Sequence, residues 1–178
     1  MVILLQPGCF SRQEIIPICA LQGDGSVSPF QGKGIVTTGV VVAHRERPQE
    51  AGFFLQQEQC DGDRNTSDGI FVIAPGASLC VGDEVRVTGT VQEIEGETQI
   101  RVESERIRIL SVGHPLPDPQ PLDELLDARD LPLRLEAREG MLVHLQGGVV
   151  SGFVNDETVM WIFPILSGLT DREYENVR

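Results

Sequence analysis

Short runs of β-branched and aromatic residues, separated by polar turns, fill the middle of the chain. Within 84–91 the valines occupy one face and the charged residues the other, the period of two that is typical of a half-buried strand. Similar runs are bounded by turns rich in glycine, aspartate and asparagine. The pattern predicts five strands, at 34–44, 52–57, 69–74, 79–96 and 98–110.

Two features indicate how these strands bend. Gly39 lies in the middle of the first strand, where a glycine usually marks a bulge or a sharp bend. In the fifth strand the apolar positions change parity between Val102 and Ile107, which predicts a bulge near 104–106. Two long strands and two short ones suit an all-β, five-stranded Greek-key barrel. An open sandwich is the structural alternative.

The chain changes character after the fifth strand. Four prolines within 113–121 predict an extended spacer, and a short helix is expected at 121–132. Two or three further strands are expected within 138–163. The predicted organisation is a lead-in segment (1–24), the barrel (25–112), a proline-rich linker with a short helix (113–134), and a small β-rich C-terminal extension with a tail (135–178).

Composition agrees with this fold and restricts what the chain binds. The 19 glycines and 11 prolines fit many turns between short strands. The formal net charge is -13, and Lys33 is the one lysine among 14 cationic side chains. The long-range field therefore repels polyphosphates, which argues against strong nucleic-acid binding by this chain alone.

The first residues contain a short apolar run without a basic segment before it. Pro7 and Ser11 interrupt this run before it reaches the length that spans a membrane. The sequence therefore predicts no signal peptide, no transmembrane helix and no membrane partner.

Four cysteines, Cys9, Cys19, Cys60 and Cys80, form an even set without a CxxC motif or paired histidines. This spacing argues against a zinc site and leaves disulfides or buried free thiols. Four cysteines allow three pairings, and the spacing does not choose among them.

One loop concentrates oxygen-bearing side chains with the D-x-D-x-N spacing of calcium loops, which brings alternate side chains to one point. These candidate metal ligands are Asp61, Asp63, Asn65, Ser67 and Asp68. The helix, the glycine at the sixth position and the glutamate at the twelfth position of such loops are missing. An Asx-rich turn that caps its own backbone amides is the alternative. Ca²⁺ is the cofactor that this loop suggests.

Aromatic side chains on the short strands are candidates for stacking on nucleic-acid bases: Phe53, Phe54 and Phe71. Because Phe53 and Phe54 are adjacent in a strand, they point to opposite faces, so one of them is expected in the core. The other either offers a stacking surface or packs beneath a loop.

Arginines are the other candidate nucleic-acid contacts. Arg45 and Arg47 lie at the connection after the first strand, and Arg86 lies on a long strand with Arg101, Arg106 and Arg108 farther along. Guanidinium groups hold phosphates or stack on bases. The alternative is a solvated face on which these arginines pair with nearby glutamates. The three histidines are isolated and no serine or cysteine sits in a nucleophile motif, so no catalytic residue is predicted.

Several longer phrases occur in order between residues 18 and 143: LQGDGSVSPFQGKGIVTTGVVV, GFFLQQ, DGDRNTSDGIFV, VGDEVRVTGTVQEIEGETQI and LEAREGMLV. Together they resemble the oligonucleotide/oligosaccharide-binding (OB) domain that precedes the catalytic domain in large extracellular bacterial nucleases. Several ordered segments are more specific than a single short motif. The resemblance implies an OB-like barrel and places the acidic loop within the family pattern.

In such nucleases a separate endonuclease/exonuclease/phosphatase-type domain cleaves phosphodiesters with a divalent ion, so Mg²⁺ is expected only for that domain. The chain shows none of that domain. The resemblance therefore implies a non-catalytic module, including the product of a truncated nuclease gene, that binds or positions single-stranded DNA or RNA beside a nuclease catalytic domain. It also implies an extracellular or periplasmic location. The alternative is a calcium-stabilised structural or interaction domain that packs on a partner domain without binding nucleic acid.

Overall fold

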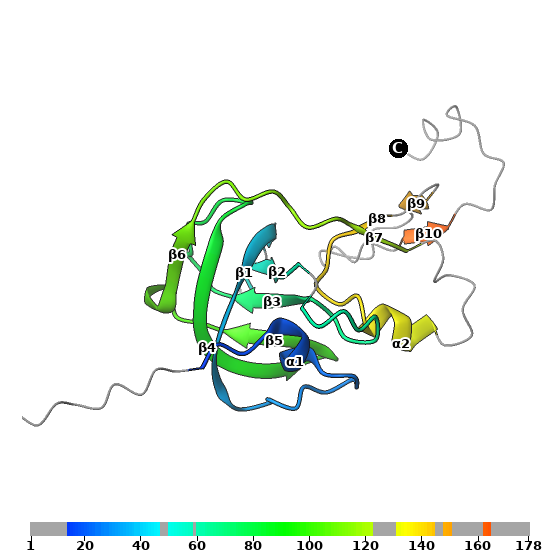
Figure 1. The fold of residues 1–178 in the computed structure, drawn as a ribbon, viewed down its shortest axis with the longest axis horizontal. Coiled ribbons are helices and arrows are strands. Elements are labelled where there is room, and N and C mark those ends of the chain that lie inside the picture. The colour runs from blue at the N-terminus through cyan, green and yellow to red at the C-terminus, as the bar shows by residue number, and fades with distance from the viewer. Residues whose placement is uncertain are drawn as a thin grey trace, which may run out of the picture.

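The computed structural model describes residues 14–46, 50–58, 60–122, 131–144, 148–150 and 162–164. Figure 1 shows strands with a few short helices. The elements, in chain order, are α1 (Ile18–Gln22), β1 (Gly34–Arg45), β2 (Gly52–Gln56), β3 (Gly69–Ile73), β4 (Glu84–Ile94), β5 (Glu97–Arg101), the 3₁₀ turn η1 (Ser104–Arg106), β6 (Ile107–Ser111), β7 (Gln120–Pro121), α2 (Leu131–Glu136), β8 (Val143–His144), β9 (Gly148–Val150) and β10 (Ile162–Pro164).

The first five strands close into a barrel. Their order is β1-β2-β3-β5-β4, and β4 pairs back onto β1 through seven residue pairs that run from Gly34↔Thr90 to Val40↔Glu84. The β3–β5 pair is parallel and the other pairs in this ring are antiparallel. A closed five-stranded ring confirms the predicted all-β Greek-key barrel and excludes the open sandwich.

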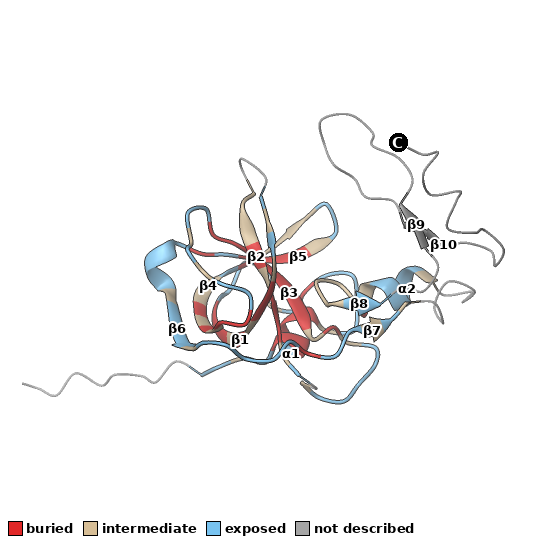
Figure 2. Cartoon of the chain, turned by 90° about the horizontal axis from the view of Figure 1, so that it is seen from above, coloured by how far each residue is buried: buried red, intermediate tan, exposed pale blue. Residues whose placement is uncertain are grey.

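The barrel core follows from the period of two in its strands. Alternate apolar side chains point inward and are almost completely buried: Val41, Phe53, Leu55, Ile70, Val72, Val85, Val87, Val91 and Ile100. Ile18 and Leu21 of α1 belong to the same cluster. Figure 2 shows the buried residues concentrated in the barrel strands and α1, whereas β6 and α2 are mostly exposed. Each such side chain stabilises the fold by about 1.5–3 kcal/mol.

Gly39 does not form the predicted bulge; it allows β1 and β2 to approach each other closely. A Cβ at Gly39 would lie 2.8 Å from Leu55 Cγ and 2.9 Å from the Gln56 carbonyl oxygen, so a side chain there would collide with β2. The irregularity in the β1–β2 register falls later, between Val41 and Ala43. The glycine thus permits close approach of two strands, and the bulge lies beyond it.

The irregularity predicted in the fifth strand lies at its predicted place, but it is a 3₁₀ turn between two strands and not a bulge. The strand continues as β5 and β6, and the intervening η1 turn covers Ser104–Arg106. β5 pairs with the last part of β4 and β6 pairs with its first part, so both follow one long partner strand. The change of parity in the sequence therefore marks a 3₁₀ turn, after which the chain continues as a second strand, β6.

Most of the helix expected at 121–132 falls on residues 123–130, which lie outside the described residues; α2 covers Leu131–Glu136. The β-rich extension contains the strands β8, β9 and β10; β8 pairs with β7, and β9 pairs with β10. No helix in the described part of the chain has the length and apolar character needed to cross a membrane.

Candidate functional site

The outer face of β2, β3 and β5 carries a compact group of side chains, which we call the aromatic-arginine cluster: Arg45, Phe54, Phe71, Glu97 and Gln99. Phe54 lies directly across from Phe71, and Phe71 directly across from Gln99. The Phe54 and Phe71 ring centroids are 4.9 Å apart with a 47° angle between the rings. Because core residues alternate with these positions, the cluster faces away from the core.

Arg45, at the end of β1, lies over both rings of the cluster. Its guanidinium carbon is 3.9 Å from the Phe71 ring centroid and 4.9 Å from that of Phe54. Both terminal nitrogens donate to the Glu97 carboxylate, at 2.8 and 2.6 Å. This bidentate pair fixes the guanidinium plane against the aromatic faces, where a cation is attracted by the ring electrons. Phe71 is only 1% exposed beneath it, so the half-buried Phe54 is the accessible ring.

Two neighbouring residues complete the geometry. A Cβ at Gly52 would lie 2.0 Å from the Val72 carbonyl oxygen and 3.0 Å from Phe71 Cζ, so only glycine leaves room for the Phe71 ring. Gln99 is 2% exposed; its amide nitrogen donates to Glu97, and its amide oxygen is buried without a partner in the described residues. The cluster therefore contains one buried acceptor that its own side chains leave unused.

The structure brings three of the predicted nucleic-acid contacts together and places Phe53 and Arg86 elsewhere. Arg45, Phe54 and Phe71 form one cluster. The assignment of Phe53 as a contact residue is wrong for this structure, because Phe53 is 1% exposed and belongs to the barrel core. Arg86 lies on β4, which pairs with β1, β5 and β6 and not with β2 or β3.

Arg47 lies outside the described residues. The sequence reasoning missed Glu97 and Gln99, although both occupy outward positions of a strand that carries alternating polar residues. That alternation is a signal for an outer face, but it does not reveal which partner strand supplies the arginine.

The acidic loop is held by its own hydrogen bonds. Asp61 Oδ1 accepts from the Asp63 backbone N–H at 2.8 Å, and Asp63 Oδ1 accepts from the Asn65 backbone N–H at 3.0 Å. The Thr66 hydroxyl donates to Asp61 Oδ2 at 3.0 Å. These contacts are those of consecutive Asx turns, the alternative to a calcium loop.

Ser67 and Asp68 make contacts that differ from those of Asp61, Asp63 and Asn65. The buried Ser67 hydroxyl donates to the Glu139 carbonyl oxygen at 2.6 Å, and Asp68 Oδ1 accepts from the Cys60 N–H at 3.2 Å. Burial raises the pKa of Asp68, with nearby Asp61 adding to the effect. The five predicted calcium ligands thus serve two structural purposes, and calcium binding stays a prediction.

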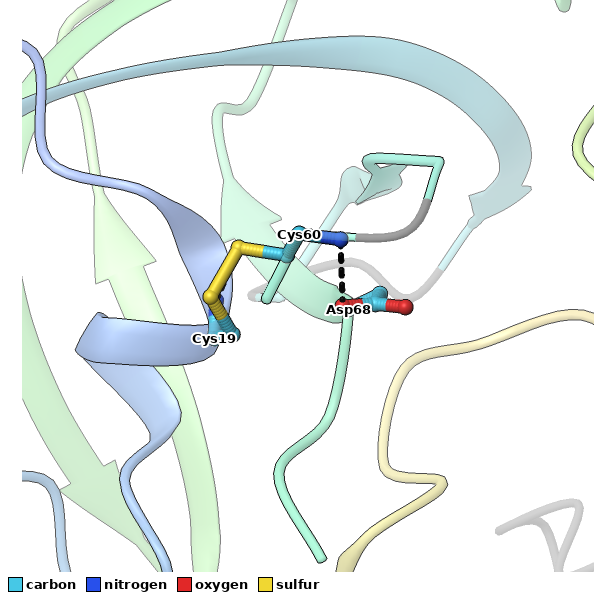
Figure 3. Close-up of side chains that lie close together, drawn as sticks. All are labelled: Cys19, Cys60 and Asp68. Atoms are coloured by element: carbon cyan, nitrogen blue, oxygen red, sulfur yellow. Dashed lines mark hydrogen bonds between the residues drawn. A yellow bond between two sulfur atoms is a disulfide. The ribbon is translucent and has the colours of Figure 1, made fainter. Parts of the chain in front are cut away.

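Cys19 and Cys60 form a disulfide that ties α1 to the acidic loop, as Figure 3 shows. Within the described ranges, Cys19, Cys60 and Asp68 are the group whose ligand atoms lie within 4.8 Å of one another. A disulfide offers no thiolate to a metal ion, so this group does not make a metal site. Cys80 is a free, exposed thiol, and Cys9 lies outside the described residues.

The C-terminal arm, residues 131–144, covers one end of the outer face. Leu142 N–H donates to Gln56 Oε1 at 2.9 Å, and Glu139 Oε1 accepts from Thr98 N–H at 2.7 Å. Gly69 and Gly140 touch so closely that a Cβ on Gly69 would lie 2.4 Å from the Gly140 carbonyl. Figure 1 shows α2 of this arm beside the loop between β2 and β3. These hydrogen bonds of the arm go to Gln56 and Thr98, beside the aromatic-arginine cluster, in which Phe54 is half-buried and Arg45 and Glu97 are 23% and 25% exposed.

Glu139 is the most perturbed acid of the arm. Burial raises its pKa to about 8, and the carboxylates of Glu136, Glu97 and Glu93 add to the rise, while the hydrogen bond from Thr98 N–H opposes it. Its second carboxyl oxygen is buried without a partner in the described residues. A protonated carboxyl at this position avoids a buried negative charge beside three others.

A serine, a histidine and a glutamate also meet beyond the end of β6. The Ser111 hydroxyl donates to Glu84 Oε2 at 2.7 Å and lies 2.6 Å from His114 Nε2. The same His114 Nε2 lies 3.5 Å from Glu84 Oε2. In hydrolase triads the acid holds the other imidazole nitrogen, so these three residues lack the required arrangement.

The strand order and the parallel β3–β5 pair define an OB-like barrel. No protein-family model and no curated protein sequence matches the chain. Among solved structures it is similar to an aspartyl-tRNA synthetase from Entamoeba histolytica, at 16% identity over 62% of this chain and 24% of the synthetase, with a TM-score of 0.40.

Two further solved structures match at a similar level. An OBody bound to hen egg-white lysozyme matches at 18% identity over 47% of this chain and 84% of the OBody, with a TM-score of 0.37. A replication protein A heterotrimer bound to ssDNA matches at 16% identity over 45% of this chain and 58% of that chain, with a TM-score of 0.33. These partial matches concern the fold, and they do not identify a ligand.

Proposed function

We propose that this chain is a non-catalytic module that binds single-stranded nucleic acid and positions it. The observation that carries the proposal is the aromatic-arginine cluster on the outer face of β2 and β3, where Phe54 is half-buried. There a half-buried phenylalanine, Phe54, lies beside a guanidinium group, that of Arg45, at 4.9 Å. An accessible aromatic ring is a surface on which a base stacks, and Arg45, whose charge is already balanced by Glu97, fixes this ring rather than binding a phosphate.

The charge of the chain sets the expected strength of binding. A net charge of -13 repels a polyanion at long range, so affinity has to come from short-range contacts. We therefore expect weak binding that falls as salt rises. The resemblance to extracellular nucleases supports a nuclease catalytic domain as the partner, an extracellular or periplasmic location, and Mg²⁺ only in that partner.

Fluorescence anisotropy with a labelled single-stranded oligonucleotide and a duplex of equal length tests this function. Phe54→Leu keeps an apolar side chain against Phe71 but removes the aromatic face. Since one stacked base contributes about 1–3 kcal/mol, this change should weaken single-strand binding by about 5- to 150-fold. Val112→Ala, at a 70% exposed position outside the cluster, is the matched control and should leave affinity unchanged. Equal affinities of wild type and Phe54→Leu would contradict the proposal.

A structural or interaction module is the second candidate, and the covered end of the face favours it. The arm already fills part of the surface that a ligand would use, through hydrogen bonds to Gln56 and Thr98. This reading predicts no oligonucleotide binding at any salt concentration. If calcium stabilises the acidic loop as well, added calcium raises the melting temperature, because a ligand that binds only the folded state stabilises it.

A further inference from the structure

Four arginines gather on an outer face of the barrel that is separate from the aromatic-arginine cluster. Arg86 on β4 and Arg108 on β6 lie directly opposite each other. Arg101, at the end of β5, lies opposite Thr90 of β4, and Arg106 lies in η1. We call these four residues the arginine face. They are 4 of the 14 lysine and arginine side chains in a chain of net charge -13, and Glu84, Glu103 and Glu105 lie near them in the sequence.

The arginine face borders a hollow of about 440 Å³. Thr88, Thr90 and Gln92, which follow Arg86 at alternate positions of β4, line this hollow, and so do Arg101 and Arg106. Because the valines of β4 point into the core, these polar side chains point outward. From Arg86 to Gln92 the strand extends about 20 Å, at about 3.3 Å per residue. The hollow therefore lies along an extended, uncharged hydrogen-bonding track with cations beside it.

The arginines of this face are not paired with carboxylates. In the described part of the chain Arg86, Arg106 and Arg108 make no ion pair and no side-chain hydrogen bond, and the Nε of Arg86 is buried without an acceptor. Glu84, which lies two residues before Arg86 on the same strand, accepts from Ser111 instead. Arg101 donates from Nε to Gln92, a neutral side chain. Guanidinium groups without carboxylate partners remain available to phosphate oxygens, which they bind in a bidentate manner.

We propose that the arginine face binds the sugar–phosphate backbone of single-stranded nucleic acid. The inference rests on the proposed function and adds the path of the backbone: phosphates lie along β4 between Arg86 and Arg101, with Arg106 at the side. The threonines of the track donate hydrogen bonds to phosphate or sugar oxygens, contacts that position a strand without reading its sequence. Binding at this face is therefore independent of base sequence.

The test compares wild type with the double variant Arg101→Gln/Arg106→Gln in anisotropy titrations with labelled oligothymidylate over a range of salt. Each phosphate contact to a single strand contributes about 0.7 to the slope of log affinity against log salt. Losing two contacts should lower the magnitude of the slope by about 1.4 and weaken binding by about 10- to 100-fold at low salt. Both side chains are exposed, and the melting temperature should match that of wild type.

Two matched variants separate a local effect from a general loss of charge. Arg64→Gln removes an exposed arginine in the acidic loop and should leave affinity and slope close to those of wild type. Glu103→Gln removes the carboxylate that also lines the hollow and should strengthen binding, because it removes repulsion of phosphate.

The outcomes distinguish this inference from the proposed function. If Phe54→Leu weakens binding while Arg101→Gln/Arg106→Gln keeps the wild-type affinity and slope, the arginine face is overturned and the function stands. If the double arginine variant alone loses affinity and slope, the arginine face is supported and stacking on Phe54 is overturned. Absence of binding by wild type at low salt overturns both.

Discussion

The disulfide between Cys19 and Cys60 makes a quantitative prediction about stability. The bond joins α1 to the acidic loop and closes a loop with a sequence separation of 41. In the chain-entropy description, the unfolded chain loses about 2.1 + 1.5R ln n cal/mol/K when a loop of n residues is closed. With n equal to the separation of 41, this amounts to about 4 kcal/mol at 25 °C.

That amount is a large share of the 5–15 kcal/mol that stabilises a typical domain. Replacing both residues by alanine, Cys19→Ala/Cys60→Ala, should lower the free energy of unfolding by about 4 kcal/mol. For a chain of this length the melting temperature should fall by about 8–16 °C. Cys19 is buried, so a small packing loss adds to this value, whereas the exposed Cys80 lies outside the bond.

Urea unfolding followed by circular dichroism measures this effect best in a background that carries Cys9→Ala and Cys80→Ala, which prevents exchange among thiols. In that background dithiothreitol should lower the stability of the Cys19–Cys60 protein to that of the double variant, and should leave the double variant unchanged. Peptide mapping by mass spectrometry identifies the linked peptides. A loss below about 1 kcal/mol, or insensitivity to dithiothreitol, would refute the reasoning.

Two further predictions concern the C-terminal arm. The pKa of Glu139 is raised to about 8 in the folded chain, so the stabilisation that Glu139 contributes is complete below about pH 4.5 and is lost as the pH rises through about 8. Glu139→Gln should therefore flatten the fall in melting temperature between about pH 5 and pH 9. The control Glu105→Gln, at an exposed position, should leave that fall unchanged. Gly140 has a φ of 68°, and a Cβ at this position would lie 2.8 Å from the backbone nitrogen of Ile70. Gly140→Ala should therefore lower the free energy of unfolding, measured in urea melts, by about 1–3 kcal/mol. The control Gly25→Ala, with open space around it, should change the free energy of unfolding by less than about 1 kcal/mol.

The barrel was predictable because its signals are local. Alternation within 84–91, turn residues between strands and a change of parity near Ser104 each depend on neighbours in the sequence. The same reasoning separates Phe53 from Phe54, since adjacent residues in a strand must face opposite sides. It does not decide which of the two side chains points into the core. In the structure that side chain is Phe53.

The rest depends on contacts between distant segments. Arg45 pairs with Glu97 across 52 positions, and Ser67 bonds to Glu139 across 72, so no local pattern indicates either contact. The cysteine pairing required the position of α1 against the acidic loop. For a related reason the bulge expected at Gly39 lies farther along, between Val41 and Ala43: only the position of β2 shows that the glycine is needed for close approach of the two strands.

The closed ring also has a consequence for the order of folding. β1 finds its main partner only when residues 84–90 have been synthesised, and β3 pairs with residues 99–101. Pairing between such distant segments makes closure of the barrel slow, so the apolar faces of the strands that are synthesised first stay exposed until β4 and β5 have formed. Cys19 and Cys60 both precede β4, and their bond would hold α1 against the acidic loop during this interval. An oxidising compartment would then shorten the search that ends in the closed barrel.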